Sequence, residues 1–251
     1  MKGKKVGITG AAGVIGTILR QGLADACDLV LFDRHRIDVA AGQRSVVLDC
    51  AEPGQVAGAF AGLHALIHLA GDPRPNAPRS STLRNNFLAT SLVFEEARRA
   101  GVAKVVFASS NFYHQGDIGR LLRGETAEPI TLDRNPTPLC LYGESKVFGE
   151  QVGRHLSLLG VRFVALRIGW AVPEDDPAPY GGAYMQAVYC SHRDLVSAFA
   201  RALAVEEAFL AAFAVSANSQ GVFDLTETRE RLGSSPQDDA ARHRRFRGPI
   251  R

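Results

Sequence analysis

A tyrosine and a lysine stand four residues apart in the segment Leu141-Tyr142-Gly143-Glu144-Ser145-Lys146. On a helix this spacing puts the side chains of Tyr142 and Lys146 on one face. A free tyrosine has a pKa of roughly 10 and is a poor base at neutral pH. A neighbouring ammonium favours the phenolate, so we expect Lys146 to lower the pKa of Tyr142. The pair predicts proton transfer by Tyr142, although Tyr-x-x-x-Lys alone also occurs by chance on surface helices.

A serine hydroxyl is expected beside this pair. The run Val105-Val106-Phe107-Ala108 leads into Ser109-Ser110-Asn111, which is typical of a buried strand that ends in polar side chains. Ser110 would hydrogen-bond a substrate oxygen and orient it toward Tyr142. Taken alone, Ser110 is more readily a turn or capping serine. The Tyr142–Lys146 pair and the other motifs of the chain favour the catalytic interpretation of Ser110.

A glycine-rich turn lies near the start of the chain. The segment Val6–Thr9 predicts a strand, and a helix is predicted from Val14-Ile15 onward. Between them and into the helix come Gly10, Gly13 and Gly16, where a tight turn, close approach to a pyrophosphate and helix–strand packing each exclude a side chain. The helix amino end then faces the phosphates. The turn predicts a dinucleotide site, against the plainer alternative of a flexible connection.

Two aspartates end the next two predicted strands. Asp33, about 20 residues after the glycines, would hydrogen-bond the adenosine ribose, which favours NAD over NADP. The following Arg34-His35-Arg36 could bind a 2′-phosphate instead. Asp49 is placed to meet the adenine edge, but an ordinary turn aspartate explains it equally well.

The fourth predicted strand ends in His68-Leu69-Ala70-Gly71. Without large side chains at Ala70 and Gly71, the backbone would run close under the nicotinamide ribose. His64 and His68 have the i, i+4 spacing of a helical metal pair, but their segment predicts a strand and no H-E-x-x-H is present. We expect packing and hydrogen-bonding histidines and no metal.

Together these motifs resemble the extended short-chain dehydrogenase/reductase (NAD-dependent epimerase/dehydratase) family over nearly the whole chain. Within that family the pattern is most similar to uronate dehydrogenases, which oxidise the anomeric carbon of a uronic acid with NAD. The segments that carry this similarity are Phe107–Asn111, Tyr142–Glu150, Leu166–Gly169 and Ser191–Asp194. The resemblance implies a catalytic set of Ser110, Tyr142 and Lys146. It implies that NAD is held by Gly10, Gly13, Val14, Ile15, Gly16, Asp33, Asp49, Leu69, Ala70, Gly71, Asn86, Lys146 and Ile168.

The resemblance leaves the substrate open. In uronate dehydrogenases a histidine follows the Ser-Ser-Asn segment, and an arginine before the Ser-His-Asp stretch clamps the sugar carboxylate; here Phe112 and Tyr184 stand in those places. Loss of a bidentate partner costs affinity for an acid. We expect Ser110, Asn111, Phe112 and Tyr184 to contact a sugar or sugar acid, with a neutral sugar or another secondary alcohol as competitors. The Ser191-His192-Arg193-Asp194 stretch itself is more readily a helix cap.

Short runs rich in β-branched residues alternate with helical segments, which predicts a doubly wound parallel sheet of the Rossmann type with a small C-terminal substrate lobe. The predicted strands are Lys5–Thr9, Leu29–Asp33, Ser45–Leu48, Ala65–Leu69, Lys104–Ser109, Arg162–Ile168 and Phe213–Ser216. The predicted helices are Val14–Ala24, Pro53–Phe60, Leu83–Ala100, Tyr142–Leu158 and Asp194–Val205.

The domain prediction is a single unit over residues 1–233, with the substrate lobe mainly at about 170–233. Residues 116–138 predict a long surface loop, and residues 175–182 predict a flap over a cleft. Residues 234–251 combine Ser-Ser-Pro with an arginine-rich run and predict a basic, mobile tail, either simply solvated or reaching a neighbouring subunit.

Composition narrows the partners and the compartment. A formal charge of +3 over 251 residues indicates no nucleic-acid surface, because the C-terminal arginines exceed that excess. Four widely separated cysteines favour a reducing cytoplasm, and no apolar run approaches membrane-spanning length. The family resemblance implies a homodimer.

Three functions therefore stand open. The first is hydride transfer from a sugar-like hydroxyl carbon to NAD. The second is an epimerase or dehydratase of the same fold, in which NAD is reduced and reoxidised within one cycle; the Asn111-Phe112 pair, where such dehydratases carry two acidic residues, disfavours it. The third is a non-catalytic dinucleotide-binding protein, which the intact Tyr142 and Lys146 disfavour.

Overall fold

The centre of the molecule is a parallel seven-stranded sheet with the strand order β3-β2-β1-β4-β5-β6-β7. A computed structural model describes residues 3–39 and 43–243. The strands are β1 (Lys5–Thr9), β2 (Asp28–Asp33), β3 (Arg44–Val47), β4 (Ala65–His68), β5 (Lys104–Ser110), β6 (Arg162–Ile168) and β7 (Phe209–Ala214). The chain reverses direction across the sheet between β1 and β4, so the predicted doubly wound Rossmann fold is confirmed.

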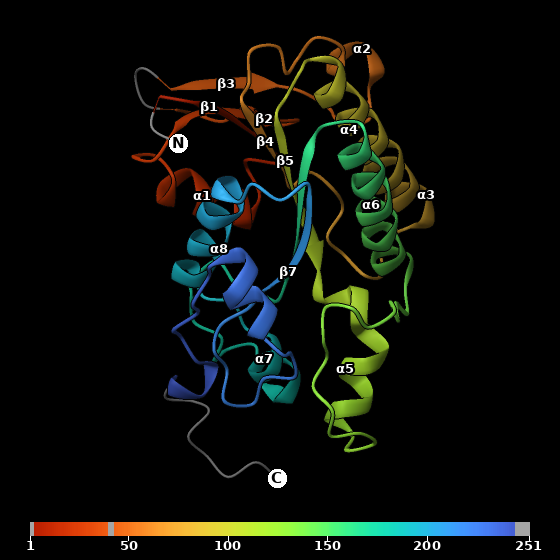
Figure 1. Cartoon of the computed structure of the whole chain (residues 1–251), viewed down its shortest axis with the longest axis vertical. Helices are drawn as coiled ribbons and strands as arrows, with labels where there is room; N and C mark the ends of the chain where they lie inside the picture. Colours follow the sequence, from red (N-terminus) through yellow and green to blue (C-terminus); the bar gives the residue numbers. More distant parts are fainter. Residues whose placement is uncertain (1–2, 40–42, 244–251) are drawn as a thin grey trace.

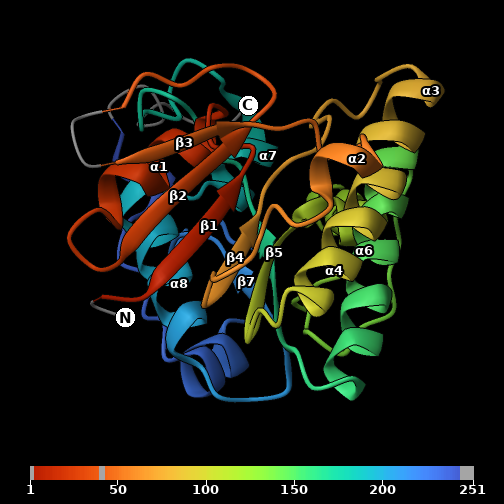
Figure 2. The ribbon, with the colours of Figure 1, turned by 90° about the horizontal axis from the view of Figure 1, so that it is seen from above.

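Helices cover both faces of the sheet, as the view from above shows (Figure 2). Helices α1 (Val14–Gly22) and α8 (His192–Ala204) bury one apolar cluster against the sheet. Helices α2 (Pro53–Val56), α4 (Ala89–Arg99) and α6 (Leu141–Leu158) bury a second cluster on the opposite face. Both clusters are apolar and closed, which holds the carboxyl ends of the strands in a fixed array.

Several element boundaries differ from the predictions, three of them by four residues. Helix α2 ends at Val56 rather than at Phe60. The last strand runs over Phe209–Ala214 rather than 213–216, because its alanine-rich first half is a poor strand signal and is placed by pairing with β6. The helix predicted from residue 83 begins earlier, with α3 (Arg79–Thr82), and passes through a π-helical turn at Leu83–Leu88 before α4. Such turns interrupt regular helices and often lie at functional sites.

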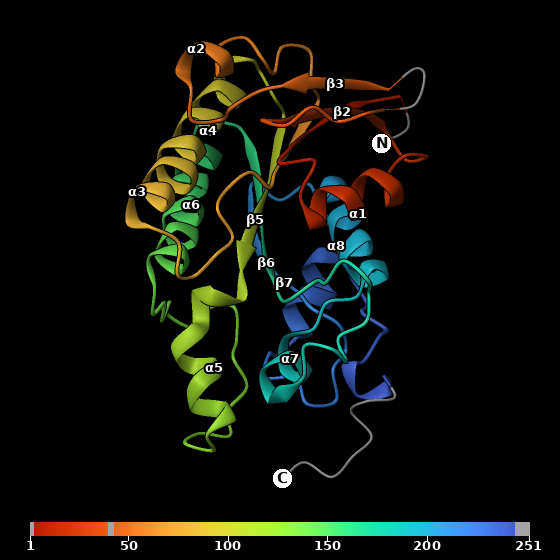
Figure 3. The ribbon, with the colours of Figure 1, turned by 180° about the vertical axis from the view of Figure 1, so that it is seen from behind.

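A smaller lobe lies beyond the carboxyl ends of the central strands (Figures 1 and 3). It contains α5 (Gln115–Leu122) and α7 (Gly182–Val188), which share an apolar cluster with the end of β7. The prediction of a loop over 116–138 is therefore wrong for its first residues. Gly116 and Gly119 lower helix propensity there, and the apolar contacts of Ile118 override it.

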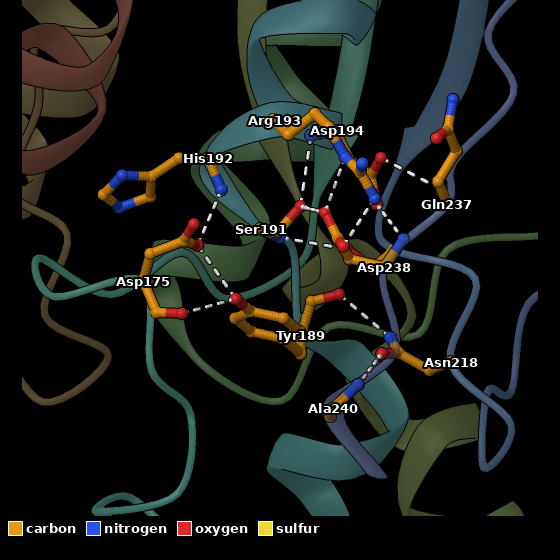
Figure 4. A network of polar contacts seen from close by, with 11 residues as sticks. Asp175, Tyr189, Ser191, His192, Arg193, Asp194, Asn218, Gln237, Asp238 and Ala240 are labelled. Carbon is orange, nitrogen blue, oxygen red and sulfur yellow. Dashed lines mark hydrogen bonds and ion pairs between the residues drawn. The ribbon is translucent and has the colours of Figure 1, made fainter. Parts of the chain in front are cut away.

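The start of the predicted tail is docked rather than mobile. The Asp194 carboxylate accepts hydrogen bonds from the backbone amides of Gln237 and Asp238, both at 3.0 Å (Figure 4). The Ser191 hydroxyl donates to Asp238 at 2.7 Å, and Ala240 is fully buried. The tail prediction is wrong for residues 234–243, because the sequence pattern does not reveal these acceptors. Residues 244–251 lie outside the described part of the chain.

The predicted flap is fixed at its first residue. The Tyr189 hydroxyl donates to the Asp175 carboxylate at 2.8 Å, and the same carboxylate accepts from the backbone amide of His192 (Figure 4). Ser191 caps α8 by accepting from the backbone amide of Asp194 at 3.1 Å, as the capping interpretation predicts. Among the helices of the described residues, none has the length and apolar character needed to cross a bilayer.

Candidate active site

A cleft of about 680 Å³ opens at the carboxyl ends of the strands, on both sides of the β1–β4 boundary. This is where doubly wound sheets bind their ligands. All the predicted site residues except Asn86 line this cleft. The fold therefore brings together residues that are up to 174 positions apart in the sequence, from Gly10 to Tyr184.

The turn after β1 has the shape of a phosphate cradle. Gly10 has a φ of +72°, and a Cβ there would lie 2.7 Å from the backbone nitrogen of Ala70. A Cβ on Gly16 would lie 2.5 Å from the carbonyl oxygen of Gly10, so the helix can pack this closely only with glycine. Gly13 begins α1 and offers no side-chain cap, which leaves the first amides of the helix to an anion. The residues present fit a dinucleotide pyrophosphate.

Asp33 ends β2 beside this turn. Its carboxylate accepts hydrogen bonds from the backbone amides of Ala12 and His35, both at 2.9 Å. These bonds orient the carboxylate and leave it capacity to accept hydroxyl donors, because an ionised carboxylate has about four acceptor positions. Asp33 can therefore hold a ribose while remaining part of the cradle.

Asp49 lies at the same end of the cleft, next to Arg84. Burial alone would raise the pKa of Asp49, but the hydrogen bonds from the backbone of Ala51 and from Arg84 outweigh it and lower the pKa. Asp49 is therefore a turn aspartate by its contacts and also a cleft residue by its position. The two interpretations of the sequence are compatible.

Tyr142 and Lys146 lie one turn apart on α6 and face the cleft together. The Lys146 ammonium is 5.3 Å from the centre of the Tyr142 ring and donates to the carbonyl oxygen of Ala108 at 2.8 Å. Ser110, at the end of β5, lines the same part of the cleft and is close enough to Tyr142 to affect its pKa. The three predicted catalytic side chains therefore meet at one point of the cleft.

The pKa of Tyr142 departs from the expectation. Burial raises it, and the hydrogen bond from Ser110 lowers it only in part. Burial also lowers the pKa of Lys146 to about 8. In the protein without NAD, burial therefore sets the direction of the shift, and the Lys146 ammonium is directed to the Ala108 carbonyl. The expected lowering of the Tyr142 pKa, which includes the positive nicotinamide ring, stays a prediction for the complex with NAD.

Asn86 lies in the π-helical turn, behind the cleft wall. Its side-chain oxygen accepts from the backbone amide of Asp72 at 2.8 Å, and its amide nitrogen donates to the carbonyl oxygen of Asp72 at 3.1 Å. The same nitrogen donates to the Ser145 hydroxyl at 3.2 Å. Asn86 therefore ties the segment after β4 to the helix that carries Tyr142, and it does so without lining the cleft.

The end of the cleft beside Ser110 is aromatic. The Phe112 ring meets the edge of the Tyr142 ring at 5.4 Å, and the Tyr184 hydroxyl donates to the side-chain oxygen of Asn111. Trp170, which follows β6, also lines the cleft. Sequence reasoning missed Trp170, although a lone tryptophan just after a buried strand was a usable signal.

Comparison with known proteins identifies the family. Residues 6–177 match the model of the NAD dependent epimerase/dehydratase family. The chain belongs to this family. The predicted resemblance to extended short-chain dehydrogenases/reductases is thus confirmed, and this member of the family is an NAD-dependent enzyme of the oxidoreductase class.

The similar proteins carry the names of dehydrogenases for different sugars. The chain is 32% identical to an L-arabinose 1-dehydrogenase (NAD(P)(+)) of Haloferax volcanii, over 94% of this chain and 98% of that protein. It is 33% identical to an NAD-dependent glucose-6-phosphate dehydrogenase of the same organism, over 93% of each. The crystal structure of uronate dehydrogenase from Agrobacterium tumefaciens superimposes with a TM-score of 0.83 at 29% identity, covering 100% of this chain and 92% of that one.

A buried ion pair lies directly beneath the catalytic end of this epimerase/dehydratase-family cleft. The Arg167 guanidinium donates to both carboxylate oxygens of Glu150, at 3.1 and 2.9 Å. Glu150 also accepts from the Ser109 hydroxyl at 2.5 Å, and Arg167 contacts the ring nitrogen Nε2 of His114 at 2.9 Å. Sequence reasoning missed this network. The signal was an arginine inside the apolar run of β6 and a glutamate four residues after Lys146.

The histidines serve packing in this fold. His68 contacts the hydroxyls of Thr9 and Thr90 through its two ring nitrogens, at 2.7 and 3.2 Å. Burial lowers its pKa to about 3, so the ring is neutral at physiological pH. His64 is half-buried, and its Nε2 lies 3.1 Å from the Lys4 ammonium, so it is the hydrogen-bonding histidine of the two. Across residues 3–39 and 43–243, no three His, Cys, Asp or Glu side chains come together as a metal site.

Proposed function

We propose that this chain is an NAD-dependent sugar dehydrogenase that oxidises a hydroxyl-bearing carbon of its substrate. The observation that carries the proposal is the convergence of Ser110, Tyr142 and Lys146 in the same cleft as the glycine cradle. Bound NAD would supply the acceptor for the hydride. The backbone of the turn after β1 would hold its pyrophosphate, and Asp33 would hold its adenosine ribose.

The chain's own residues would move the proton. The Ser110 hydroxyl would donate to the substrate oxygen and keep it within reach of Tyr142. The Tyr142 phenolate would take the hydroxyl proton while the substrate carbon is oxidised to a carbonyl or lactone. Lys146 would bind the ribose next to the reacting ring and stabilise the phenolate, whose pKa is raised by burial in the protein alone.

The substitution Tyr142→Phe tests this assignment. It removes one oxygen atom and keeps the ring against Phe112, so we expect loss of turnover by on the order of 10²-fold or more with NAD affinity nearly unchanged. NADH absorbance measures turnover, and calorimetry measures NAD binding. Near-native turnover by the variant contradicts the role of Tyr142. Product formed without net NADH would instead indicate an epimerase.

A further inference from the structure

Few cationic side chains line the described part of the cleft. Among the described residues that line it, the lysines and arginines are Arg34 and Lys146. Arg34 follows β2, four strand spacings from β6, which is roughly 19 Å. Lys146 is committed to the Ala108 carbonyl and faces the Tyr142 ring. Neither cation is placed to bind a group at the far end of a substrate beyond Ser110.

The cleft lining also contains a negative charge, at Asp72 after β4. Asp72 lines the cleft and is 8% exposed. Arg74 donates to its two carboxylate oxygens at 2.9 and 2.7 Å, and these bonds hold the pKa of Asp72 well below its usual range. Asp72 therefore stays ionised, and the charge of Arg74 is neutralised by it. A substrate carboxylate or phosphate here would lose water without gaining a free cation.

Aromatic faces and neutral hydroxyls line the end of the cleft beside Ser110. Trp170 lies 5.8 Å from the Tyr180 ring and 6.4 Å from the Tyr184 ring, and 43% of its surface is exposed. An exposed tryptophan beside a cleft presents a flat apolar surface with a polar edge. The Tyr184 hydroxyl, which donates to the side-chain oxygen of Asn111, lines the same cleft. Such a wall fits the C–H face of a sugar ring, with hydroxyl partners around the rim.

We propose that the substrate is an uncharged aldose whose ring packs on Trp170, and that sugar acids and sugar phosphates are discriminated against. This inference rests on the proposed dehydrogenase function and specifies its substrate class. The wall formed by Trp170 and Tyr184 determines specificity by offering a stacking surface and a hydroxyl group in place of a cation.

The single tryptophan of the chain supplies a binding assay that does not depend on turnover. In the Tyr142→Phe variant saturated with NAD, Trp170 fluorescence is followed while L-arabinose, D-galactose, D-galacturonate or glucose 6-phosphate is added. We expect a saturable change in fluorescence with a neutral aldose. For the anionic sugars, the concentration that gives half of the change should be at least about ten-fold higher. With the wild-type enzyme, NADH formation should give the same order in kcat/KM.

Substitutions at Tyr184 test the charge argument directly. Tyr184→Arg adds a guanidinium where the hydroxyl contacts Asn111, and Tyr184→Met removes the hydroxyl without adding charge. Hydrogen bonds to charged groups favour binding enough for a shift on the order of ten-fold. We expect Tyr184→Arg, relative to Tyr184→Met, to raise the galacturonate-to-galactose ratio of kcat/KM by that amount.

The outcomes separate the two proposals. Wild-type kcat/KM that is higher for galacturonate or glucose 6-phosphate than for every neutral aldose overturns the substrate inference and leaves the dehydrogenase function standing. A saturable change in Trp170 fluorescence with a neutral aldose, without NADH formation from any sugar, overturns the dehydrogenase function. It leaves standing the inference that the cleft binds an uncharged sugar. Absence of any fluorescence change with neutral aldoses overturns the inference.

Discussion

The buried ion pair beneath the cleft makes the sharpest stability prediction. Glu150 and Arg167 are each 4% exposed in their side chains, so water screens them little. In Glu150→Gln the guanidinium keeps its charge but loses a bidentate carboxylate, and the Ser109 hydroxyl loses an ionised acceptor. Removing one partner of a buried pair leaves an uncompensated charge and costs about 3–5 kcal/mol.

That cost is large for one domain. About 1 kcal/mol shifts the melting temperature of a 150–250-residue domain by about 2–4 °C, so Glu150→Gln should lower Tm by on the order of 6–20 °C. Urea unfolding followed by circular dichroism measures the free energy of unfolding directly. The wild-type slope against urea concentration should be retained, because the folded core is unchanged.

Glu95→Gln is the matched control. Glu95 also accepts from two arginine side chains, Arg98 and Arg99, but it is 44% exposed on the outer face of α4. Its loss should move the urea midpoint little, since exposed ion pairs contribute weakly. The apolar double variant Glu150→Leu with Arg167→Met should unfold at a higher urea concentration than Glu150→Gln. A midpoint for Glu150→Gln as close to wild type as that of Glu95→Gln would refute the reasoning.

Two further predictions concern the glycine cradle and acid stability. Gly16→Ala would place a Cβ 2.5 Å from the Gly10 carbonyl oxygen, so calorimetry should find NAD binding lost and Tm lowered; Gly54→Ala, with open space around it, is the control. Burial lowers the pKa of His114 to about 3, below the roughly 6.5 of an unfolded histidine. The unfolded chain therefore binds more protons between these values, and stability is lost as pH falls through them. Urea midpoints at pH 7 and pH 5 should differ less in His114→Gln than in wild type, whereas the exposed His155→Gln should leave the difference unchanged. An equal pH 5 loss in His114→Gln and wild type would contradict this assignment.

The parallel sheet and most of its strands followed from local signals. Apolar β-branched runs such as β1 and β5 are buried on both faces, and their sequence alone marks them as central parallel strands. The start of β7 and the helix α5 escaped prediction because alanines and glycines weaken the local pattern. Their placement depends on long-range pairing and on a shared apolar cluster, which a window of sequence does not contain.

Some residues of the candidate site were also predictable from local sequence signals, and others were not. Gly10 and Asp33 were predictable from their spacing within one strand–helix–strand unit. Tyr142 and Lys146 were predictable from their spacing on one helix. The partners of Glu150 were not, since Arg167 and Ser109 come from separate strands and meet it only in the folded chain. The raised pKa of Tyr142 also escaped prediction, because it depends on burial rather than on neighbours along the helix.

The polar contacts of α6 fix the position of Tyr142 relative to the end of β5. Tyr142, Lys146 and Glu150 follow one another at four-residue intervals, so they form a stripe along one side of the helix. Lys146 bonds to the Ala108 carbonyl, and Glu150 bonds to the next residue of β5, Ser109. A slip of α6 by one turn would break both bonds, and Tyr142 would then lose its place beside the residue that follows them on the strand. The ion pair at Glu150 therefore fixes the register of helix against strand, which is why its loss should reduce kcat as well as stability.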